Sequence, residues 1–223
     1  MNNIHIILAS GSPRRRELMQ QIGLDFEVQV SEVEENVTST VPAEVVQELS
    51  RQKAEAVAKL VFVQTNDRAW NQDIRQKINT DDSMMRSLVL GADTIVACDG
   101  RILGKPKDAA DAVQMLTMLS GRAHEVYTGV TFVYTDPMDG AIRTHTFYEC
   151  TKVHFASMTA EEIAEYVATG DPMDKAGAYG IQGFCARYIT GIEGDYNNVV
   201  GLPVGRVYQE LRKIIHKLGI DAF

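Results

Sequence analysis

Residues 88–98 read LVLGADTIVAC, and the fold of the chain is predicted outward from this stretch. Apart from Asp93-Thr94 it is a nearly continuous run of apolar residues, and such a run predicts a strand. Asp99-Gly100 follows at once, and this pair is a strong signal for a two-residue hairpin. Residues 101–103 are therefore expected to return as a second strand beside the first.

Strands and helices alternate on both sides of this stretch. Residues 4–8 predict a buried strand, and a helix follows with Ser12 as N-cap, Pro13 at the first helical position and Gly23 at the end. Further strands are expected at 26–30, 126–134, 142–155 and 184–189, and further helices at 43–61, 109–119, 160–170 and 204–218. Interleaved elements with hairpins predict an α/β fold with a mixed sheet. The polar segment 64–86 predicts a long connection within a single domain of residues 1–223.

Composition and charge exclude several classes of partner. The chain has 22 basic and 30 acidic residues, a formal net charge of −8, so it has no general attraction to nucleic acids or anionic membranes. No stretch approaches the roughly 20 apolar residues that cross a bilayer, and the N-terminus does not resemble a signal peptide. Cys98, Cys150 and Cys185 are widely spaced, which argues against a zinc site or a disulfide framework. We expect a cytoplasmic protein that binds neither nucleic acid nor membrane.

Asp93 is the sharpest single signal in the sequence. It occupies a position where the strand pattern demands an apolar residue, and burying an unpaired carboxylate is very costly. The group is therefore expected to be paired, bound to a metal or placed at a cleft; a structural aspartate bonded to a nearby loop is the alternative. The neighbouring Gly91 and Ala92 predict space for a ligand close to the backbone.

Basic residues at the start of the first helix predict an anion site. Ser10, Gly11 and Ser12 join a strand to a helix start, whose N–H groups and dipole favour anions. Arg14 and Arg15 oppose that dipole, a violation that a bound anion would compensate. A capped helix with a solvated basic end is the alternative interpretation.

A lysine interrupts the apolar stripe of the long helix at 43–61. Lys53 lies on the stripe formed by Val46, Leu49, Val57 and Leu60. Its ammonium could enter a cleft and neutralise phosphate oxygens, or it could reach water while its stem packs.

Three further segments complete the candidate site. Lys105 follows the hairpin and is expected beside Asp93. Glu32, Glu34 and Glu35 could supply a metal ligand, although a bare acidic run is more typical of a solvated face. Residues 174–183, DKAGAYGIQG, have too many small residues for a packing element and indicate a binding loop. The five histidines form no ligand spacing and are interpreted as structural.

Several motifs in order resemble the Maf family. They are LASGSPRR at 8–15, GADT at 91–94, GKP at 104–106, DKAGAYGIQG at 174–183 and NVVGLP at 198–203. The resemblance spans nearly the whole chain outside 64–86, a connection longer than the family leads us to expect. It implies a two-lobed, elongated mixed sheet flanked by helices with a central cleft, similar to the inosine triphosphate pyrophosphatases. It also implies a metal-dependent nucleoside triphosphate pyrophosphatase, often homodimeric, and the form of the loop resembles the dTTP/UTP branch.

The resemblance also assigns roles to individual residues. Asp93 matches the general base, and Arg14, Thr94 and Gln182 match positions that distinguish the branches. Arg15, Lys53 and Lys105 match phosphate-contacting positions. Glu35, or its neighbour Glu34, matches the acid that binds Mg²⁺ or Mn²⁺ together with Asp93. The alternatives are a 7-methyl-GTP pyrophosphatase and a non-catalytic nucleotide-binding regulator of septum formation.

Overall fold

The computed structural model describes residues 4–63 and 87–219. Its strands are β1 (His5–Leu8), β2 (Phe26–Val28), β3 (Ser87–Cys98), β4 (Arg101–Leu103), β5 (Ala123–Thr135), β6 (Ile142–Phe155) and β7 (Ile189–Glu193). Its α-helices are α1 (Pro13–Gln21), α2 (Pro42–Val63), α4 (Ala109–Leu119), α5 (Ala160–Ala168), α6 (Tyr196–Val200) and α7 (Val204–Lys217). Three 3₁₀ turns, η2 (Asp171–Asp174), η3 (Ala176–Ala178) and η4 (Phe184–Tyr188), lie between α5 and β7. The predicted long connection at 64–86 lies outside the described residues.

The described strands form one mixed sheet in the order β2-β1-β3-β5-β6-β7, with β4 paired to β3. β1 runs parallel to β2 and β3, whereas β3, β5, β6 and β7 are successively antiparallel. β3 is the central strand, as its apolar sequence indicates. The prediction of an α/β fold with a mixed sheet flanked by helices is confirmed.

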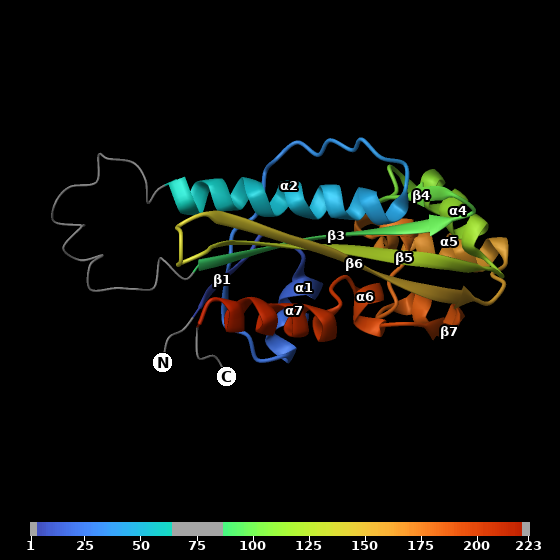
Figure 1. The fold of residues 1–223 in the computed structure, drawn as a ribbon. Helices are drawn as coiled ribbons and strands as arrows, with labels where there is room; N and C mark the ends of the chain where they lie inside the picture. Colours follow the sequence, from blue (N-terminus) through green and yellow to red (C-terminus); the bar gives the residue numbers. More distant parts are fainter. Residues whose placement is uncertain (1–3, 64–86, 220–223) are drawn as a thin grey trace.

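The sheet has a different helix on each face (Figure 1). Helix α2 lies along one face, where its Val46, Val57 and Ala58 are buried. Helices α1 and α7 cover the opposite face, where Met19 and Leu211 join the largest core cluster. Helices α4 and α5 pack together at one end of the elongated molecule. Because side chains alternate across a strand, consecutive residues of β3 point to opposite faces of the sheet and contact different helices.

Gly91 on β3 and Gly129 on β5 allow α2 to approach the sheet closely. A Cβ atom on Gly91 would lie 2.5 Å from the carbonyl oxygen of Ser50, and one on Gly129 would lie 2.1 Å from that of Val46. The prediction that Gly91 leaves room for a ligand is therefore wrong. Its missing side chain makes room for the backbone of α2, the helix that carries Lys53.

Replacing Gly129 with alanine is expected to lower the free energy of unfolding by about 3 kcal/mol, the upper range for overpacking, because the added methyl group meets helix backbone. Urea denaturation measures the change. Gly205→Ala is the control, since Gly205 is exposed in α7 with nothing within 4 Å of an added Cβ. That variant should be up to about 1 kcal/mol more stable than wild type. A Gly129→Ala protein as stable as wild type would contradict the close approach of α2.

Most local signals in the sequence form the structures that they predict. Asp99 (φ 49°) and Gly100 (φ 73°) make the turn between β3 and β4. Ser12 is the N-cap residue of α1, although its side chain makes no capping hydrogen bond.

Two details of the predicted secondary structure and burial are wrong. The strand predicted at 184–189 is the 3₁₀ turn η4, in which Phe184 stacks on Tyr166, and β7 starts only at Ile189. Leu60 is 54% exposed, because the buried stripe of α2 continues through Ala58, Val61 and Phe62.

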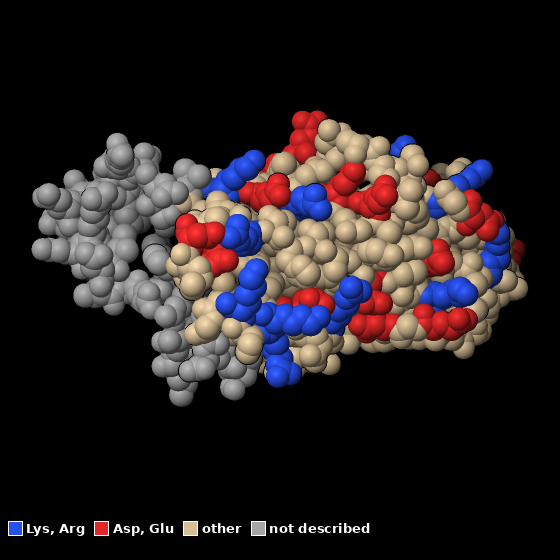
Figure 2. Space-filling model, viewed as in Figure 1, with Lys and Arg blue, Asp and Glu red and all other residues tan. Residues whose placement is uncertain are grey.

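Charged side chains of both signs are intermingled on the face shown in Figure 2. This distribution is in keeping with a chain of 22 basic and 30 acidic residues. Among the helices in the described ranges, none is long and apolar enough to cross a membrane.

Candidate active site

A cavity of about 990 Å³ opens at one edge of strand β3. β1 pairs with β3 only as far as Leu90, and β4 pairs with it only from Val96 onward. Within the described residues, the β3 edge between these two points has no partner strand, and the cavity occupies this gap. Ligands of open α/β sheets commonly bind beyond the carboxyl end of a strand in this way.

The site residues predicted from the sequence line this one cavity, except that Glu35 is the only acid of the Glu32, Glu34 and Glu35 run among the described residues that line it. The predicted residues that line it are Ser10, Gly11, Ser12, Arg14, Arg15, Glu35, Lys53, Asp93, Thr94, Lys105 and Gln182. They come from the β1–α1 junction, the first turn of α1, the segment before α2, α2 itself, β3, the loop after β4 and the 174–183 loop. Segments far apart in sequence are thus brought to a single site.

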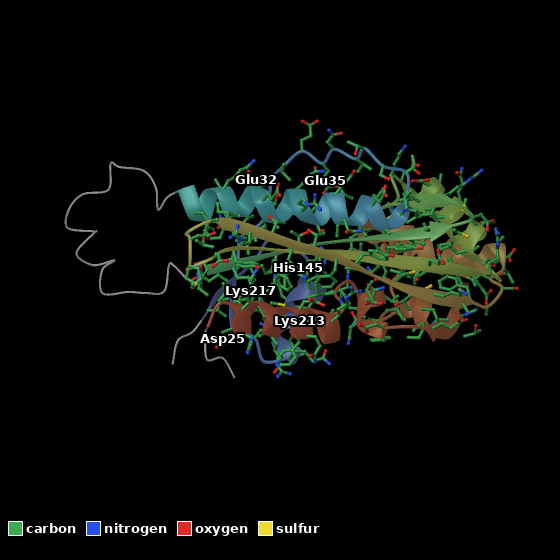
Figure 3. All side chains as sticks on the ribbon, viewed as in Figure 1. Asp25, Glu32, Glu35, His145, Lys213 and Lys217 are labelled. Carbon is green, nitrogen blue, oxygen red and sulfur yellow. The ribbon has the colours of Figure 1, made fainter. Side chains whose placement is uncertain are left out.

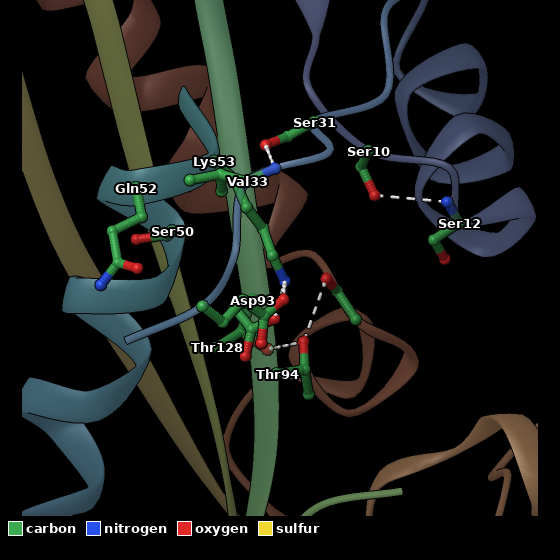
Figure 4. A network of polar contacts seen from close by, with 12 residues as sticks. Ser10, Ser12, Ser31, Val33, Ser50, Gln52, Lys53, Asp93, Thr94 and Thr128 are labelled. Carbon is green, nitrogen blue, oxygen red and sulfur yellow. Dashed lines mark hydrogen bonds and ion pairs between the residues drawn. The ribbon is translucent and has the colours of Figure 1, made fainter. Parts of the chain in front are cut away.

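Lys53 joins two carboxylates on one side of the cavity. Its ammonium reaches from α2 to Oδ1 of Asp93 on β3 (Figure 4). It also lies 2.9 Å from Oε1 of Glu35, which Figure 3 shows beside α2 in the segment after β2. The side chains of Lys53 and Asp93 are only 17% and 14% exposed, whereas that of Glu35 is 49% exposed. The buried charge of Asp93 is therefore paired with Lys53, and Glu35 is the acid of its run that reaches the same ammonium.

Arg15 lies on the other side of β3 and is held by neutral oxygen atoms. Its Nε donates to the Gly201 carbonyl (2.8 Å), Nη1 to the Ser10 hydroxyl (3.1 Å) and Nη2 to the Thr94 hydroxyl (3.0 Å). Burial lowers the pKa of Arg15, while the nearby charges of Asp93 and Glu35 raise it. Because the acceptors of these three hydrogen bonds are neutral, the charge of the guanidinium stays available for an anion in the cavity.

The 174–183 loop borders the cavity and also packs into the core. Ala178 and Tyr179 are buried, and a Cβ on Gly177 would lie 2.8 Å from Val96. The prediction that this loop is not a packing element is therefore wrong: its small residues let it pack against β3. Gln182, by contrast, is exposed in the cavity.

Two charged groups of this loop were not singled out from the sequence. Lys175 is only 13% exposed, and its ammonium lies 3.0 Å from Asp171 and 2.7 Å from Asp174. Asp174 in turn pairs with Arg14 at 3.1 Å, which links the loop to α1. The motif that contains Lys175 was visible in the sequence, but its ion pairs depend on how the loop folds back on itself.

A buried histidine contacts the 174–183 loop through Tyr179. Nε2 of His124 on β5 lies 2.8 Å from the Tyr179 hydroxyl, and the ring is 2% exposed. Burial, and to a smaller extent the nearby His154, lowers the pKa of His124 to about 4.

Acid is expected to destabilise the protein through His124. The unfolded chain binds this proton with a pKa near 6.5, whereas the folded chain binds it only near 4, so stability falls as the pH drops through this window. Between pH 7 and pH 5, the titration of His124 is expected to lower the free energy of unfolding by about 2 kcal/mol. Urea titrations at the two pH values measure it. A His124→Gln variant lacks the titrating group and should lose less; equal losses in both proteins would contradict this assignment.

Comparison with known proteins shows the family. A family model described as Maf-like protein matches residues 5–214. The chain belongs to the Maf family.

Bacterial relatives of this Maf-family chain are similar over almost their whole length. A protein of Agathobacter rectalis is 55% identical over 216 residues, which are 97% of this chain and 98% of the relative. One of Lachnoclostridium phytofermentans is 44% identical over 97% of this chain and 96% of its own length. One of Bacillus cytotoxicus is 49% identical over 93% of this chain and 94% of its own length. Each of these three relatives is named dTTP/UTP pyrophosphatase.

The chemistry of the Maf-family site suits a hard divalent cation. In the described residues, no group of three or more His, Cys, Asp and Glu side chains is arranged to hold a metal. Asp93 and Glu35 nevertheless converge on one point, which is taken by the Lys53 ammonium. Mg²⁺ is typically bound by one or two carboxylates, with phosphates and waters as its other ligands. Two convergent carboxylates in a cavity therefore fit such an ion.

Proposed function

We propose that this chain hydrolyses dTTP and UTP to the nucleoside monophosphate and pyrophosphate. The observation that carries the proposal is the cavity in which a carboxylate pair, Asp93 and Glu35, faces the cations of Arg15, Lys53 and Lys105. Acids and cations around one space suit a reaction that activates water next to a polyanion. The names of the three relatives support the same reaction and the same nucleotides.

Asp93 acts as the general base in this proposal. Its carboxylate takes a proton from water, the water oxygen attacks the α-phosphorus, and the bond from that phosphorus to the bridging oxygen of the β-phosphate breaks. Arg15, Lys53, Lys105 and the N–H groups around Ser10 to Ser12 stabilise the negative charge of the triphosphate and of the leaving pyrophosphate.

Asp93 and Glu35 hold the divalent metal in the same proposal. Nucleoside triphosphate pyrophosphatases generally depend on such an ion, and Mg²⁺ or Mn²⁺ suits two carboxylates and phosphate oxygens. When bound, the ion neutralises phosphate charge and makes the phosphorus more electrophilic. Lys53 contacts both carboxylates and is well placed to move its ammonium from them to the phosphates.

Nucleotide choice is assigned to Arg14, Thr94 and Gln182. The exposed amide of Gln182 can both donate and accept hydrogen bonds, as recognition of a pyrimidine edge requires. Arg14 reaches the loop that carries Gln182 through Asp174. Thr94 acts differently, because its hydroxyl is bonded to Arg15.

Pyrophosphate release tests the proposal directly. The nucleotides are dTTP, UTP, CTP, GTP and 7-methyl-GTP, each with and without Mg²⁺ or Mn²⁺. Metal-dependent release fastest with dTTP and UTP is the expected result, and release led by 7-methyl-GTP would assign the chain to the other branch. Nucleotide binding without any release would identify a binding protein instead of an enzyme.

Sedimentation of the same protein tests the expected homodimer.

A further inference from the structure

A chain of hydroxyl groups runs from Arg15 into the sheet, and Figure 4 shows its two threonines, Thr94 and Thr128. Thr94 on β3 and Thr128 on β5 are directly opposite each other, and their hydroxyl oxygens are 2.9 Å apart. Behind them, the Thr128 hydroxyl donates to the carbonyl oxygen of Asn198 at 3.1 Å. Thr128 is fully buried, so it cannot touch a ligand in the cavity.

The direction of these hydrogen bonds follows from counting hydrogens. Each threonine hydroxyl has one hydrogen to donate, and that of Thr128 goes to Asn198. This leaves the Thr94 hydroxyl as the donor to Thr128, whose oxygen at 2.9 Å is a closer acceptor than the Gly201 carbonyl at 3.4 Å. Its lone pairs are left to accept from Nη2 of Arg15. Hydrogen bonds aligned in one direction polarise and strengthen one another.

The far end of this chain is rigidly anchored. Asn198 is fully buried, and its Nδ2 donates to the Val126 carbonyl and to the Thr151 hydroxyl, each at 3.0 Å. Three residues later the Gly201 carbonyl accepts from Nε of Arg15. The 198–203 motif has no role in the proposed chemistry. It contacts Arg15 directly through Gly201 and indirectly, from Asn198, through Thr128 and Thr94.

We propose that Thr128 is a positioning residue for Arg15: its hydroxyl orients that of Thr94, and Thr94 holds the guanidinium ready for the phosphates. This inference rests on the proposed function for the identity of the anion. Orientation matters because a guanidinium binds phosphate oxygens through donors in a fixed plane. Loss of the Thr128 hydroxyl frees the Thr94 hydroxyl to turn away from Arg15.

Matched substitutions on one strand test this role. Thr128→Val removes the hydroxyl at nearly constant volume, and Thr128→Ser restores it. Thr131→Val is the control, because Thr131 is also a fully buried residue of β5, but its hydroxyl is bonded to Ser50 and Thr146. Calorimetry measures binding of α,β-methylene-dTTP, which resists cleavage at the α-phosphorus, and of inorganic tripolyphosphate.

Thr128→Val should bind both probes about tenfold more weakly, as expected for loss of one well-oriented hydrogen bond to a charged group. Thr128→Ser and Thr131→Val should stay within about twofold of wild type. If Thr128→Val does not fold, Thr128→Cys, a weak donor, should show an intermediate loss. Equal binding by Thr128→Val and Thr131→Val overturns the inference, and so does a Thr128→Ser variant as weak as Thr128→Val.

The two probes separate this inference from the proposed function. Wild-type protein that binds tripolyphosphate but not α,β-methylene-dTTP contradicts the proposed nucleotide, while the tripolyphosphate series still tests Thr128. Wild-type protein that binds neither probe overturns the anion-binding role of Arg15 and the inference with it.

Discussion

Replacing Asp93 with asparagine is expected to lower kcat about 1,000-fold or more, within the range for loss of a general base combined with loss of a metal ligand. The amide has nearly the shape of the carboxylate and can still accept a hydrogen bond from Lys53, so the sheet should fold as before. What it lacks is the negative charge and the ability to take a proton from water. Pyrophosphate release from dTTP, followed together with the thermal unfolding midpoint, measures both properties.

Asp136→Asn is the matched control for this substitution. Asp136 is also a buried aspartate paired with a cation, Arg143, but it lies in the β5–β6 turn and not among the residues that line the cavity. Its replacement should leave kcat within about twofold of wild type, since Asp136 does not line the cavity in which the reaction is proposed to occur. Turnover by Asp93→Asn within about tenfold of wild type would remove Asp93 from the mechanism as its base.

Replacing Lys53 with methionine is expected to move two measurements in opposite directions. Catalytic efficiency toward dTTP should fall about 100-fold or more, because an ammonium that binds the phosphates is lost. Affinity for Mn²⁺ without nucleotide should rise about tenfold, because no cation then competes for Asp93 and Glu35. Steady-state kinetics measures the first effect, and electron paramagnetic resonance of free Mn²⁺ measures the second.

The control substitution is at Lys59, on the same helix as Lys53. Lys59 is exposed on α2, so Lys59→Met removes an equal charge from the protein without changing the site. It should alter neither measurement. If Lys53→Met binds Mn²⁺ more weakly than wild type, Asp93 and Glu35 are not the carboxylates that hold the metal. If Lys53→Met keeps full catalytic efficiency, the Lys53 ammonium does not bind the phosphates of the substrate.

Much of the candidate site could be predicted from charges that break an apolar pattern. Asp93 interrupts a strand and Lys53 interrupts a helix stripe, and the structure places their side chains in contact. Such anomalies are informative because a buried charge without a partner is too costly to persist. The turn at Asp99-Gly100 and the start of α1 at Pro13 were predictable for a similar reason, since they depend on the backbone preferences of adjacent residues.

The α/β pattern, the local turns and the residues that surround the cavity could thus be predicted from the amino-acid sequence alone. Which atoms meet depends on the packing of distant segments: Glu35 reaches Lys53, Gly91 faces helix α2 and Thr128 lies behind Thr94. Arg15 and Gly201, which are 186 residues apart, show the limit most clearly. Periodicity and propensity act over a few neighbouring residues, whereas these contacts exist only after distant segments have packed on one sheet.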